Sequence, residues 1–508
     1  MDGTPLSGTT VPVIGGGFGG LAAACYLADA GADVRLLEQH ERVGGVAGRL
    51  ERDGFRFDTG PSWYLMPDVF ERFFEAFDRQ PTDYYELERL DPKYCVFWKD
   101  GDSADVAADT DEVRALFESY EPGAGDAFDA YLDEAAYTYE VGMERFVYED
   151  RPRLRDWIDL DVLRSARGLT LLGSMADHAA DYFENPKLRQ LMQYTLVFLG
   201  GSPHNTPALY NLMAHVDHGL GVYYPEGGIY SVVEGMAELA RELGVELRTG
   251  REVTAVDTVP DGLVASTADG DAVVGDRIVA NANPAHVERD LAPPAASGGP
   301  PGGWDAATYA PSAFMLYLGV EGPVDPLAHH TLVLPTDWDP HFEQIFDEPA
   351  WPDDPSYYVN VPSLTDPTVA PDGHHAVVVL VPIAPGLDDG PAVRERYRQR
   401  VLADLADHAG GDLRDRIVVE ETACVSEFAE RVHAPQGTAL GLAHTLRQTG
   451  PFRPSHRAPL DGLYYAGGYT TPGIGMPMCL ISGEHAYEAV LEDEGIRGDG
   501  AGGRRRGR

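Results

Sequence analysis

Lysine is nearly missing from this sequence, while acidic residues are abundant. The 39 basic residues include only three lysines, Lys93, Lys99 and Lys187. Aspartate and glutamate number 82, so the formal net charge is −43 at pH 7. A surface of this sign repels phosphates, which makes nucleic acid a poor partner for the chain.

This balance of charges also indicates a habitat. An excess of acids with so little lysine resembles the composition of proteins from extreme halophiles, whose cytoplasm is rich in salt. At molar salt the Debye length falls to ~3 Å, so the self-repulsion of the chain is largely screened. An ordinary acidic protein from a GC-rich genome is the alternative. Neither reading identifies a reaction.

Cysteine is scarce as well. The four cysteines are scattered, without a CxxC pair or the spacing of a metal site, at Cys25, Cys95, Cys424 and Cys479. We expect buried, reduced thiols in a cytoplasmic protein, and we predict no metal site.

Long apolar runs are also lacking. No stretch approaches the ~18 apolar residues that cross a bilayer. The first ten residues have neither the basic nor the apolar region of a signal peptide. The sequence therefore predicts a cytoplasmic protein, at most peripherally associated with a membrane. What the chain does have is length, since 508 residues with 44% hydrophobic content predict two or three lobes with substantial cores.

The chain opens with a strand, a helix and a second strand. Apolar residues at 11–14 and 34–37 predict the strands, and the pattern of residues 21–30 predicts the helix between them. This order is a βαβ unit. Pro12 is unusual there, because a proline cannot donate a hydrogen bond to a neighbouring strand.

A glycine pattern joins the first strand to the helix. Gly15 permits the tight turn, Gly17 lets a pyrophosphate approach the backbone, and Gly20 lets helix and strand pack closely. The positive end of the helix dipole then faces the phosphates. Glu38 ends the second strand about 20 positions further on, where a carboxylate binds ribose hydroxyls. Because this carboxylate repels a 2′-phosphate, the predicted cofactor is FAD or NAD and not NADP.

Further glycine-rich segments follow along the chain. Gly44 and Gly45 come shortly after Glu38, at a place where a NAD dehydrogenase needs no second glycine pair. Gly60 and Pro61 follow a short strand-like segment. Near the end, a strand at residues 462–466 leads through a glycine-rich turn into a final helix, with the segments Gly467-Gly468 and Gly475-Met476-Pro477. Pro477 suits the first turn of that helix.

Taken together, these segments resemble carotenoid desaturases of the phytoene desaturase family, which belong to the flavin amine oxidase superfamily. The resemblance covers nearly the whole chain, including a mid-chain FAD-contacting region at Tyr224-Pro225-x-Gly227-Gly228 and Val253. It implies that Gly44 and Gly45 close over the FAD diphosphate, and that the last helix faces one edge of the flavin. The family usually has a basic residue after this glycine pair, whereas this chain has Val46. Arg49 is the candidate for the missing cation.

The resemblance implies an α/β fold with two lobes. A Rossmann-like FAD-binding domain is expected from the three segments 1–75, 219–300 and 416–492. An α+β substrate-binding lobe with a helical lid is expected from residues 76–218 and 301–415, and residues 493–508 are predicted to be a disordered tail. The pattern from residue 68 to about 218 is mostly helical.

The implied activity is the FAD-dependent introduction of carbon–carbon double bonds into a long apolar polyene, with phytoene or a later intermediate as substrate. Oxygen or a quinone is the implied electron acceptor, and contact with a membrane is expected because the substrate resides there. No catalytic side chain is predicted; Glu226 and His215 are guesses for a base. The proposed apolar entrance, with a plain core helix as its alternative, comprises Leu188, Leu191, Met192, Thr195, Leu196 and Leu199.

Four alternatives remain open at this point. A desaturase acting later, for example at the 3,4 bond of an already coloured carotenoid, fits the same segments. A carotenoid cis–trans isomerase uses the same fold without net oxidation. An amine oxidase shares the opening motifs but binds a small amine, and a non-catalytic carotenoid carrier is the fourth.

Overall fold

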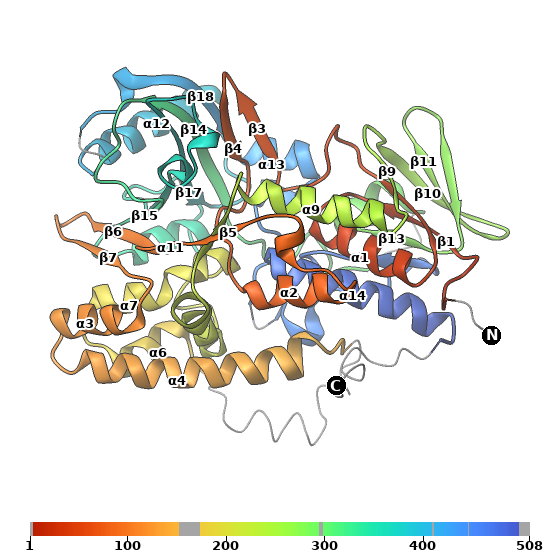
Figure 1. Ribbon diagram of the computed structural model, residues 1–508, viewed down its shortest axis with the longest axis horizontal. Coiled ribbons are helices and arrows are strands. Elements are labelled where there is room, and N and C mark those ends of the chain that lie inside the picture. Colours follow the sequence, from red (N-terminus) through yellow and green to blue (C-terminus); the bar gives the residue numbers. More distant parts are fainter. Residues whose placement is uncertain (1–3, 152–172, 294–297, 409–410, 446, 497–508) are drawn as a thin grey trace.

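The computed structural model describes residues 4–151, 173–293, 298–408, 411–445 and 447–496. They form an α/β protein with two sheets of different construction side by side (Figure 1). This arrangement confirms the expected fold class of a Rossmann-like domain joined to an α+β lobe.

The first sheet is parallel and takes its strands from three distant parts of the chain. Its order is β19-β13-β1-β2-β9, and every neighbouring pair is parallel. Its strands are β1 (Thr10–Ile14), β2 (Asp33–Leu37), β9 (Glu246–Arg248), β13 (Ile278–Ala280) and β19 (Leu463–Tyr465). The opening strand therefore lies at the centre, and the closing strand lies at one edge.

Helices α1 (Phe18–Asp29) and α14 (Met476–Asp493) pack on this sheet, and α9 (Ile229–Glu242) packs on α1. The last helix crosses the first at Gly483, where a Cβ atom would come within 2.7 Å of the Ala22 Cβ and the Gly19 carbonyl. The two ends of the chain are therefore held together by a contact that only a very small residue permits.

Pro12 fits the sheet because of where β13 begins. Thr10 and Ile14 accept hydrogen bonds from the backbone of Asp276 and Asn281, so this alternating set of residues faces β13. Pro12 belongs to the same set, but the pairing of β1 with β13 begins only at Val13. No ladder hydrogen bond is therefore lost at Pro12.

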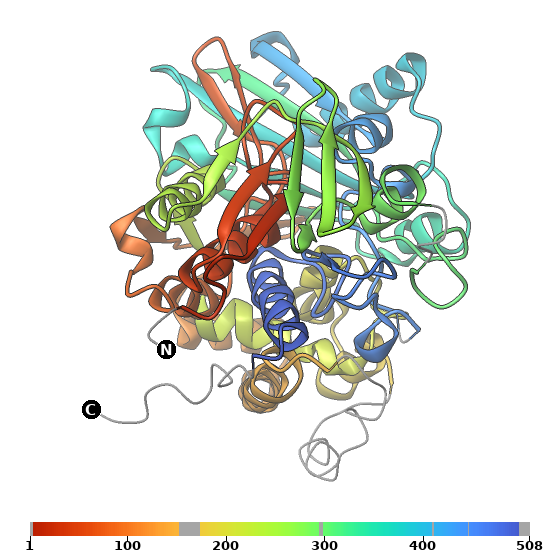
Figure 2. The ribbon, with the colours of Figure 1, turned by 90° about the vertical axis from the view of Figure 1, so that its right-hand side faces the viewer.

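A small antiparallel sheet covers one side of the parallel one. It consists of β10 (Val253–Val259), β11 (Gly262–Thr267) and β12 (Ala272–Gly275). Figure 2 shows these green strands beside the red strands of the opening unit. Strand β12 contacts β1 of that unit.

The second large sheet has the order β18-β14-β17-β16-β15-β6-β7. Only β15 and β6 are parallel neighbours. Its strands are β6 (Tyr94–Trp98), β7 (Ser103–Val106), β14 (Ser312–Glu321), β15 (His330–Leu334), β16 (Tyr357–Asn360), β17 (His374–Ile383) and β18 (Ile417–Ala423). The mostly helical pattern expected before residue 218 missed β6 and β7. Because β6 is almost wholly buried, it lacks the alternation that marks a strand.

The helical layer lies beneath this sheet in Figure 1. It contains α3 (Thr110–Tyr120), α4 (Ala124–Gly142), α6 (Met175–Tyr182), α7 (Pro186–Gln193) and α8 (Leu212–Ala214). The remaining helices are α2 (Pro67–Glu75), α10 (Pro284–His286), α11 (Asp339–Phe346), α12 (Pro391–Ala406) and α13 (Val425–Val432). Two strand pairs complete the fold, β3 (Arg49–Arg52) with β4 (Phe55–Asp58), and β5 (Leu87–Arg89) with β8 (Tyr223–Pro225).

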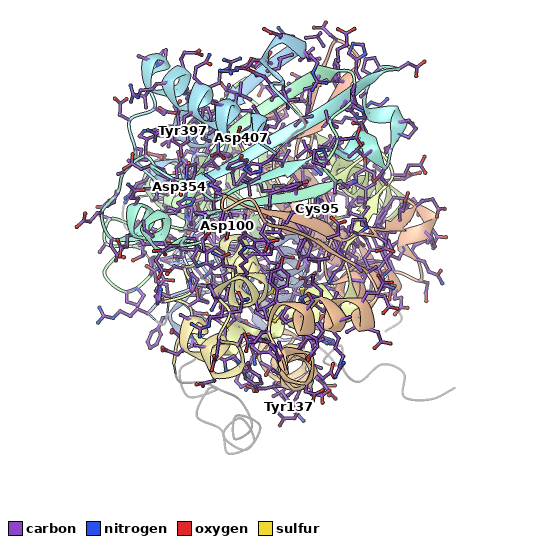
Figure 3. The ribbon with its side chains drawn as sticks, turned by 90° about the vertical axis from the view of Figure 1, so that its left-hand side faces the viewer. Cys95, Asp100, Tyr137, Asp354, Tyr397 and Asp407 are labelled. Carbon is purple, nitrogen blue, oxygen red and sulfur yellow. The ribbon has the colours of Figure 1, made fainter. Side chains whose placement is uncertain are left out.

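Each of the three lysines pairs with carboxylates. Lys99 lies 2.7 Å from Asp354, and Lys187 lies 2.8 Å from Asp100. Asp354 and Asp100 lie on the face shown in Figure 3, where Tyr137 of α4 points outward. Lys93 is different, because its ammonium is buried. The few lysines are therefore placed where acids gather.

The structure also bears on the cysteines and on the apolar helices of the chain. The four cysteines are free thiols, three of them buried and Cys479 partly so. Burial raises the pKa of Cys25 well above its ordinary value, so this thiol stays protonated. Among the described residues, no helix is both long and apolar enough to cross a bilayer.

Candidate functional site

A cavity of about 600 Å³ runs between the parallel sheet and the seven-stranded sheet. One end, here called the glycine end, is lined by backbone from the segments 14–19, 44–47 and 281–283. The other end, here called the apolar arm, is lined by side chains of the seven-stranded sheet and the helical layer.

The glycine end begins where β1 turns into α1. Gly15 has a φ of +93°, which favours glycine, and a Cβ on Gly20 would lie 2.0 Å from the Gly15 carbonyl oxygen. Gly17 is the N-cap of α1 and offers no capping side chain. The N–H groups of the first helical turn are therefore free of a side-chain cap beside the cavity, as an anion-binding helix terminus requires.

Glu38 is held in place by backbone N–H groups. Its carboxylate accepts hydrogen bonds from Gly16 (2.8 Å) and His40 (2.9 Å), and its side chain is buried at the cavity wall. Each carboxylate oxygen has two acceptor positions, so a further hydrogen bond to a hydroxyl group remains possible at each. This geometry suits a ribose.

The second glycine pair lies on the first. The Gly44 N–H donates to the Gly16 carbonyl (2.8 Å), and Gly44 and Gly45 have φ values of +125° and +58°. Gly60 packs under this loop, since a Cβ there would lie 2.4 Å from the Val46 carbonyl oxygen. Two sequence-distant turns therefore form one backbone surface.

The structure brings most of the predicted cofactor residues to the cavity. Those that line it are Gly15, Gly17, Glu38, Gly44, Gly45, Gly60, Pro61, Val253, Gly468, Gly475 and Met476. Gly20 and Gly467 lie just behind the wall and permit close packing. A Cβ on Gly467 would lie 2.6 Å from the Asn281 Oδ1.

Arg49 is not brought to the cavity. Its guanidinium pairs with Glu51 (3.2 Å) and Glu234 (3.4 Å) and lies over the Tyr230 ring. These carboxylates and the ring hold the side chain away from the cavity. The prediction that Arg49 is the cation facing the cofactor is therefore wrong.

Arg431 of α13 does not line the cavity either, but it lies against the loop that forms the wall. It donates to the Thr59 hydroxyl (2.7 Å) and to the Gly45 carbonyl (3.0 Å), directly behind the second glycine pair. In the part of the chain that the structure describes, no carboxylate forms an ion pair with it. Burial lowers the pKa of Arg431, and the nearby Glu38 carboxylate offsets this only in part. Sequence reasoning missed this residue, because it lies almost 400 positions after the glycines.

A second buried arginine supports the turn before α14. Arg453 donates to the carbonyl oxygens of Gly468 (2.6 Å) and Thr470 (2.9 Å), and burial lowers its pKa to about 10. His444, which lines the cavity, accepts the Ile474 N–H (3.2 Å). Positive charge and a helix N-terminus therefore meet at this edge of the cavity.

The apolar arm is almost free of charge. In a chain with 24% charged residues, Glu38 and Arg251 are the only Asp, Glu, Lys or Arg side chains on the described cavity wall, and both lie at the glycine end. The arm itself is lined by Val197, Leu199, Leu332, Leu334, Trp338, Phe342, Ile345, Tyr358 and Leu380. It suits a long apolar molecule and offers no partner to an ionic one.

His341, which lines the arm, is hydrogen-bonded through both of its ring nitrogens. His341 donates from Nε2 to the Pro382 carbonyl (2.9 Å) and accepts the Ser356 N–H at Nδ1 (2.8 Å). Burial lowers its pKa to about 4, so it is neutral at pH 7. Glu226 is exposed, and neither it nor His215 lines the cavity. Both guesses for a base are therefore wrong.

The expected entrance helix is a core helix in its first half. Leu188, Leu191 and Met192 of α7 are at most 2% exposed and pack with the seven-stranded sheet. The turn that follows, Tyr194–Leu199, does reach the cavity through Val197 and Leu199. The segment therefore forms part of the cavity wall rather than an apolar surface.

A dinucleotide cradle joined to an apolar arm fits an oxidoreductase of the FAD- or NAD-dependent class with an apolar substrate. Comparison with known proteins agrees with this class. Residues 18–491 match the model of the flavin containing amine oxidoreductase family. The chain is 62% identical to carotenoid 3,4-desaturase of Haloarcula japonica, over 96% of this chain and 99% of that protein. It is 33% identical to the zeta-carotene-forming phytoene desaturase of Myxococcus xanthus, over 95% and 94% of the two chains.

Solved structures share the fold at low identity. A putrescine oxidase variant aligns with a TM-score of 0.62 at 15% identity, over 96% of this chain and 99% of that one. An oxidoreductase from Methanosarcina mazei aligns with a TM-score of 0.60 over 95% and 100%. The chain belongs to the flavin containing amine oxidoreductases and groups within them with the carotenoid desaturases. It is an FAD-dependent oxidoreductase that acts on CH–CH groups.

Proposed function

We propose that the chain is a carotenoid 3,4-desaturase, which introduces a double bond near one end of a long polyene. The 62% identity to the Haloarcula japonica protein of that name supports this later step. The phytoene desaturase of Myxococcus xanthus, which represents the reaction expected from the sequence, is only 33% identical. The order of the two hypotheses is therefore reversed.

The glycine end fits FAD by its donors. Gly15, Gly17, Gly44 and Gly45 expose backbone to a diphosphate, and Glu38 offers its carboxylate to the ribose. Arg431 supplies a buried positive charge that lacks a carboxylate partner among the described residues. A diphosphate beside the second glycine pair gives this cation its missing counter-charge.

The other predicted contacts concern the flavin ring. We propose that Gly60, Pro61 and Val253 contact the cofactor from one side, and that Gly468, Gly475 and Met476 face the flavin edge. The N-terminus of α14 and the Arg453 guanidinium place positive charge there. Positive charge at that edge would stabilise negative charge that a bound cofactor gains on reduction.

The reaction removes two hydrogens from a saturated carbon–carbon pair. Bound FAD supplies the two-electron acceptor that no amino acid side chain offers. The apolar arm orients the polyene and excludes water, since its wall consists of aliphatic and aromatic side chains. His341 keeps the wall neutral, because both of its ring nitrogens are hydrogen-bonded.

The absence of carboxylates from the described wall of the arm argues against amine oxidation. A diamine carries positive charge, and its transfer into an arm without an acidic side chain costs several kcal/mol. The likeness to putrescine oxidase therefore concerns the fold alone.

We also propose how the chain divides. The parallel sheet supports an FAD-binding domain from three segments, but β18 (Ile417–Ala423) belongs to the seven-stranded sheet. The third segment is therefore proposed to begin after β18 and not at residue 416. We further propose a halophilic, cytoplasmic protein in peripheral contact with the membrane that stores its substrate, with oxygen or a quinone as electron acceptor.

The test is anaerobic incubation of the purified protein with FAD in high salt, with phytoene and a coloured acyclic C40 carotenoid as separate substrates. A 3,4-desaturase lengthens the chromophore of the coloured substrate and leaves phytoene colourless. Colour from phytoene would instead identify a phytoene desaturase. A new isomer with no added double bond would identify an isomerase, and turnover of putrescine alone would identify an amine oxidase.

A further inference from the structure

Two buried histidines and an aspartate meet outside the cavity. Asp150 follows the π-helical turn Met143–Val147, His456 precedes β19, and His485 lies on α14. One possible ligand atom from each residue lies within 4.8 Å of the other two. His456 and His485 are 2% and 1% exposed, and none of the three lines the cavity.

Hydrogen bonds to backbone carbonyls define which nitrogen of each histidine carries the proton. His456 Nδ1 lies 3.0 Å from the Tyr465 carbonyl oxygen, and His485 Nε2 lies 3.3 Å from the Tyr148 carbonyl oxygen. A carbonyl oxygen only accepts, so these two nitrogens are the donors. The lone pairs are therefore on His456 Nε2 and His485 Nδ1.

The lone pair on His485 Nδ1 accepts no hydrogen bond from the described residues, and this nitrogen is buried. The two rings lie 5.4 Å apart at 83°, so they are neighbours in an edge-to-face arrangement. A buried acceptor without a donor carries a desolvation cost, which a bound cation at this nitrogen would remove.

Two imidazole nitrogens and one carboxylate are a donor set for divalent transition metals. A ligating histidine usually donates its other N–H to a carbonyl or carboxylate, which fixes the ring. Both histidines already have that arrangement. In a tetrahedral zinc site, ligand atoms are about 3.4 Å apart, so modest side-chain rotations would close this set around one ion.

We propose that Asp150, His456 and His485 form a binding site for a divalent transition metal ion, with Zn²⁺ as the favoured ion. Water completes the tetrahedron. The Thr471 hydroxyl, which lies 2.9 Å from His456 Nε2, moves away when the ion takes that lone pair. The ion fastens the end of the helical segment at Asp150 to α14, the helix that begins at the edge of the cavity.

The test uses the full chain with its FAD, in molar KCl to weaken ion binding by the acidic surface. Protein stripped with a chelator and dialysed is titrated with ZnCl₂, and bound zinc is measured by elemental analysis after gel filtration. We expect one tightly bound Zn²⁺ per chain and a higher melting temperature. Co²⁺ in place of zinc should give the intense visible absorption of a tetrahedral site.

Variants separate this site from general binding by acids. His456→Gln and His485→Gln should each weaken Zn²⁺ binding by more than the ~10–100-fold that loss of a supporting hydrogen bond causes. The control is His204→Gln, since His204 is 60% exposed and pairs with Asp339 on the surface. This control should bind zinc like the wild type.

Two results would overturn the proposal. One is equal zinc binding by the wild type and both histidine variants, and the other is no bound zinc in the wild type after dialysis. If the histidine variants lose their FAD through misfolding, Asp150→Asn and the Co²⁺ spectrum of the wild type decide instead. Loss of the tetrahedral spectrum in Asp150→Asn would support the site, and an unchanged spectrum would refute it.

Discussion

The two ends of the cavity are built by different means. At the glycine end, short stretches of backbone meet a molecule, and a single carboxylate and buried arginines add charge. In the apolar arm, side chains from the seven-stranded sheet, α11 and the turn Tyr194–Leu199 make the wall. One end suits a polar cofactor held by hydrogen bonds, while the other suits an apolar substrate from which water is excluded.

This difference suggests that cofactor binding and substrate choice depend on different parts of the cavity. Relatives with 15% identity keep the fold, although the name of one of them is that of an enzyme acting on a diamine. A backbone cradle needs only glycines at a few positions, whereas a side-chain wall changes with every substitution. Substitutions in the arm are therefore expected to alter substrate binding more readily than cofactor binding.

The largest effect is expected from a side chain placed in the cradle. In Gly17→Val, the new Cβ would lie 2.7 Å from the Asn281 Nδ2, so Asn281 must move or the loop must open. FAD affinity should fall by at least about 100-fold, because the anion-binding helix terminus is displaced. Flavin content after gel filtration measures this loss.

The control for this variant is Gly390→Ala. A Cβ on Gly390 meets nothing closer than 3.6 Å, and the residue does not line the cavity. This protein should retain full flavin. Full occupancy in Gly17→Val would mean that the cofactor lies elsewhere.

The next effect concerns the arm alone. Val197→Asp places an unpaired carboxylate in the apolar wall, and its desolvation by a polyene costs several kcal/mol. Turnover of a carotenoid substrate should fall by about 100-fold while FAD content stays unchanged. Val274→Asp is the matched control, since Val274 is 53% exposed on β12. Equal carotenoid turnover in both variants would show that the substrate does not bind in the apolar arm.

Sequence patterns predicted the local parts of the fold. The strand, glycine turn, helix and second strand of the opening unit appear within a few residues of their predicted bounds. The glycine of the close helix contact, Gly20, acts as its position in the pattern indicates. These features depend on neighbouring residues, so a pattern in the chain records them.

Contacts between distant segments were not predictable in the same way. Strand β6 pairs with β15, more than 200 residues later, and its continuous burial hides the strand period. Arg49 matched a local expectation, but nearby carboxylates hold it outside the cavity. Arg431 stands in an ordinary amphipathic helix, and only the packing of α13 against the glycine pair gives it a role.

The two arginines provide a direct test of the glycine end. Arg431→Ala removes a buried cation beside the proposed diphosphate, and charged hydrogen bonds of this kind are worth about 1.5–3 kcal/mol. FAD affinity should therefore fall by about 10–100-fold, measured by flavin fluorescence titration. Arg49→Ala should change it by less than about 3-fold, because that side chain pairs with surface carboxylates. A larger loss of FAD affinity in Arg49→Ala than in Arg431→Ala would show that Arg49 is the cation that binds the cofactor.

Salt should act on the two ends of the cavity differently, with the smallest effect of the four. FAD carries a negative diphosphate into a protein with a formal charge of −43, so long-range repulsion opposes its binding. Raising KCl from 0.2 to 2 M shortens the Debye length to a few Å and removes this repulsion, while the buried contact with Arg431 is screened much less. FAD affinity should therefore rise by a few-fold.

A neutral polyene has no such charge, so its binding should respond to salt only through the hydrophobic effect, which potassium chloride changes weakly. Circular dichroism at each salt concentration guards against unfolding at low salt, which would imitate weak binding. Sodium chloride at equal ionic strength should give the same FAD affinity as KCl. If FAD binding weakens as salt rises, local attraction to the arginines outweighs the net charge, and the acidic surface plays no part in cofactor uptake.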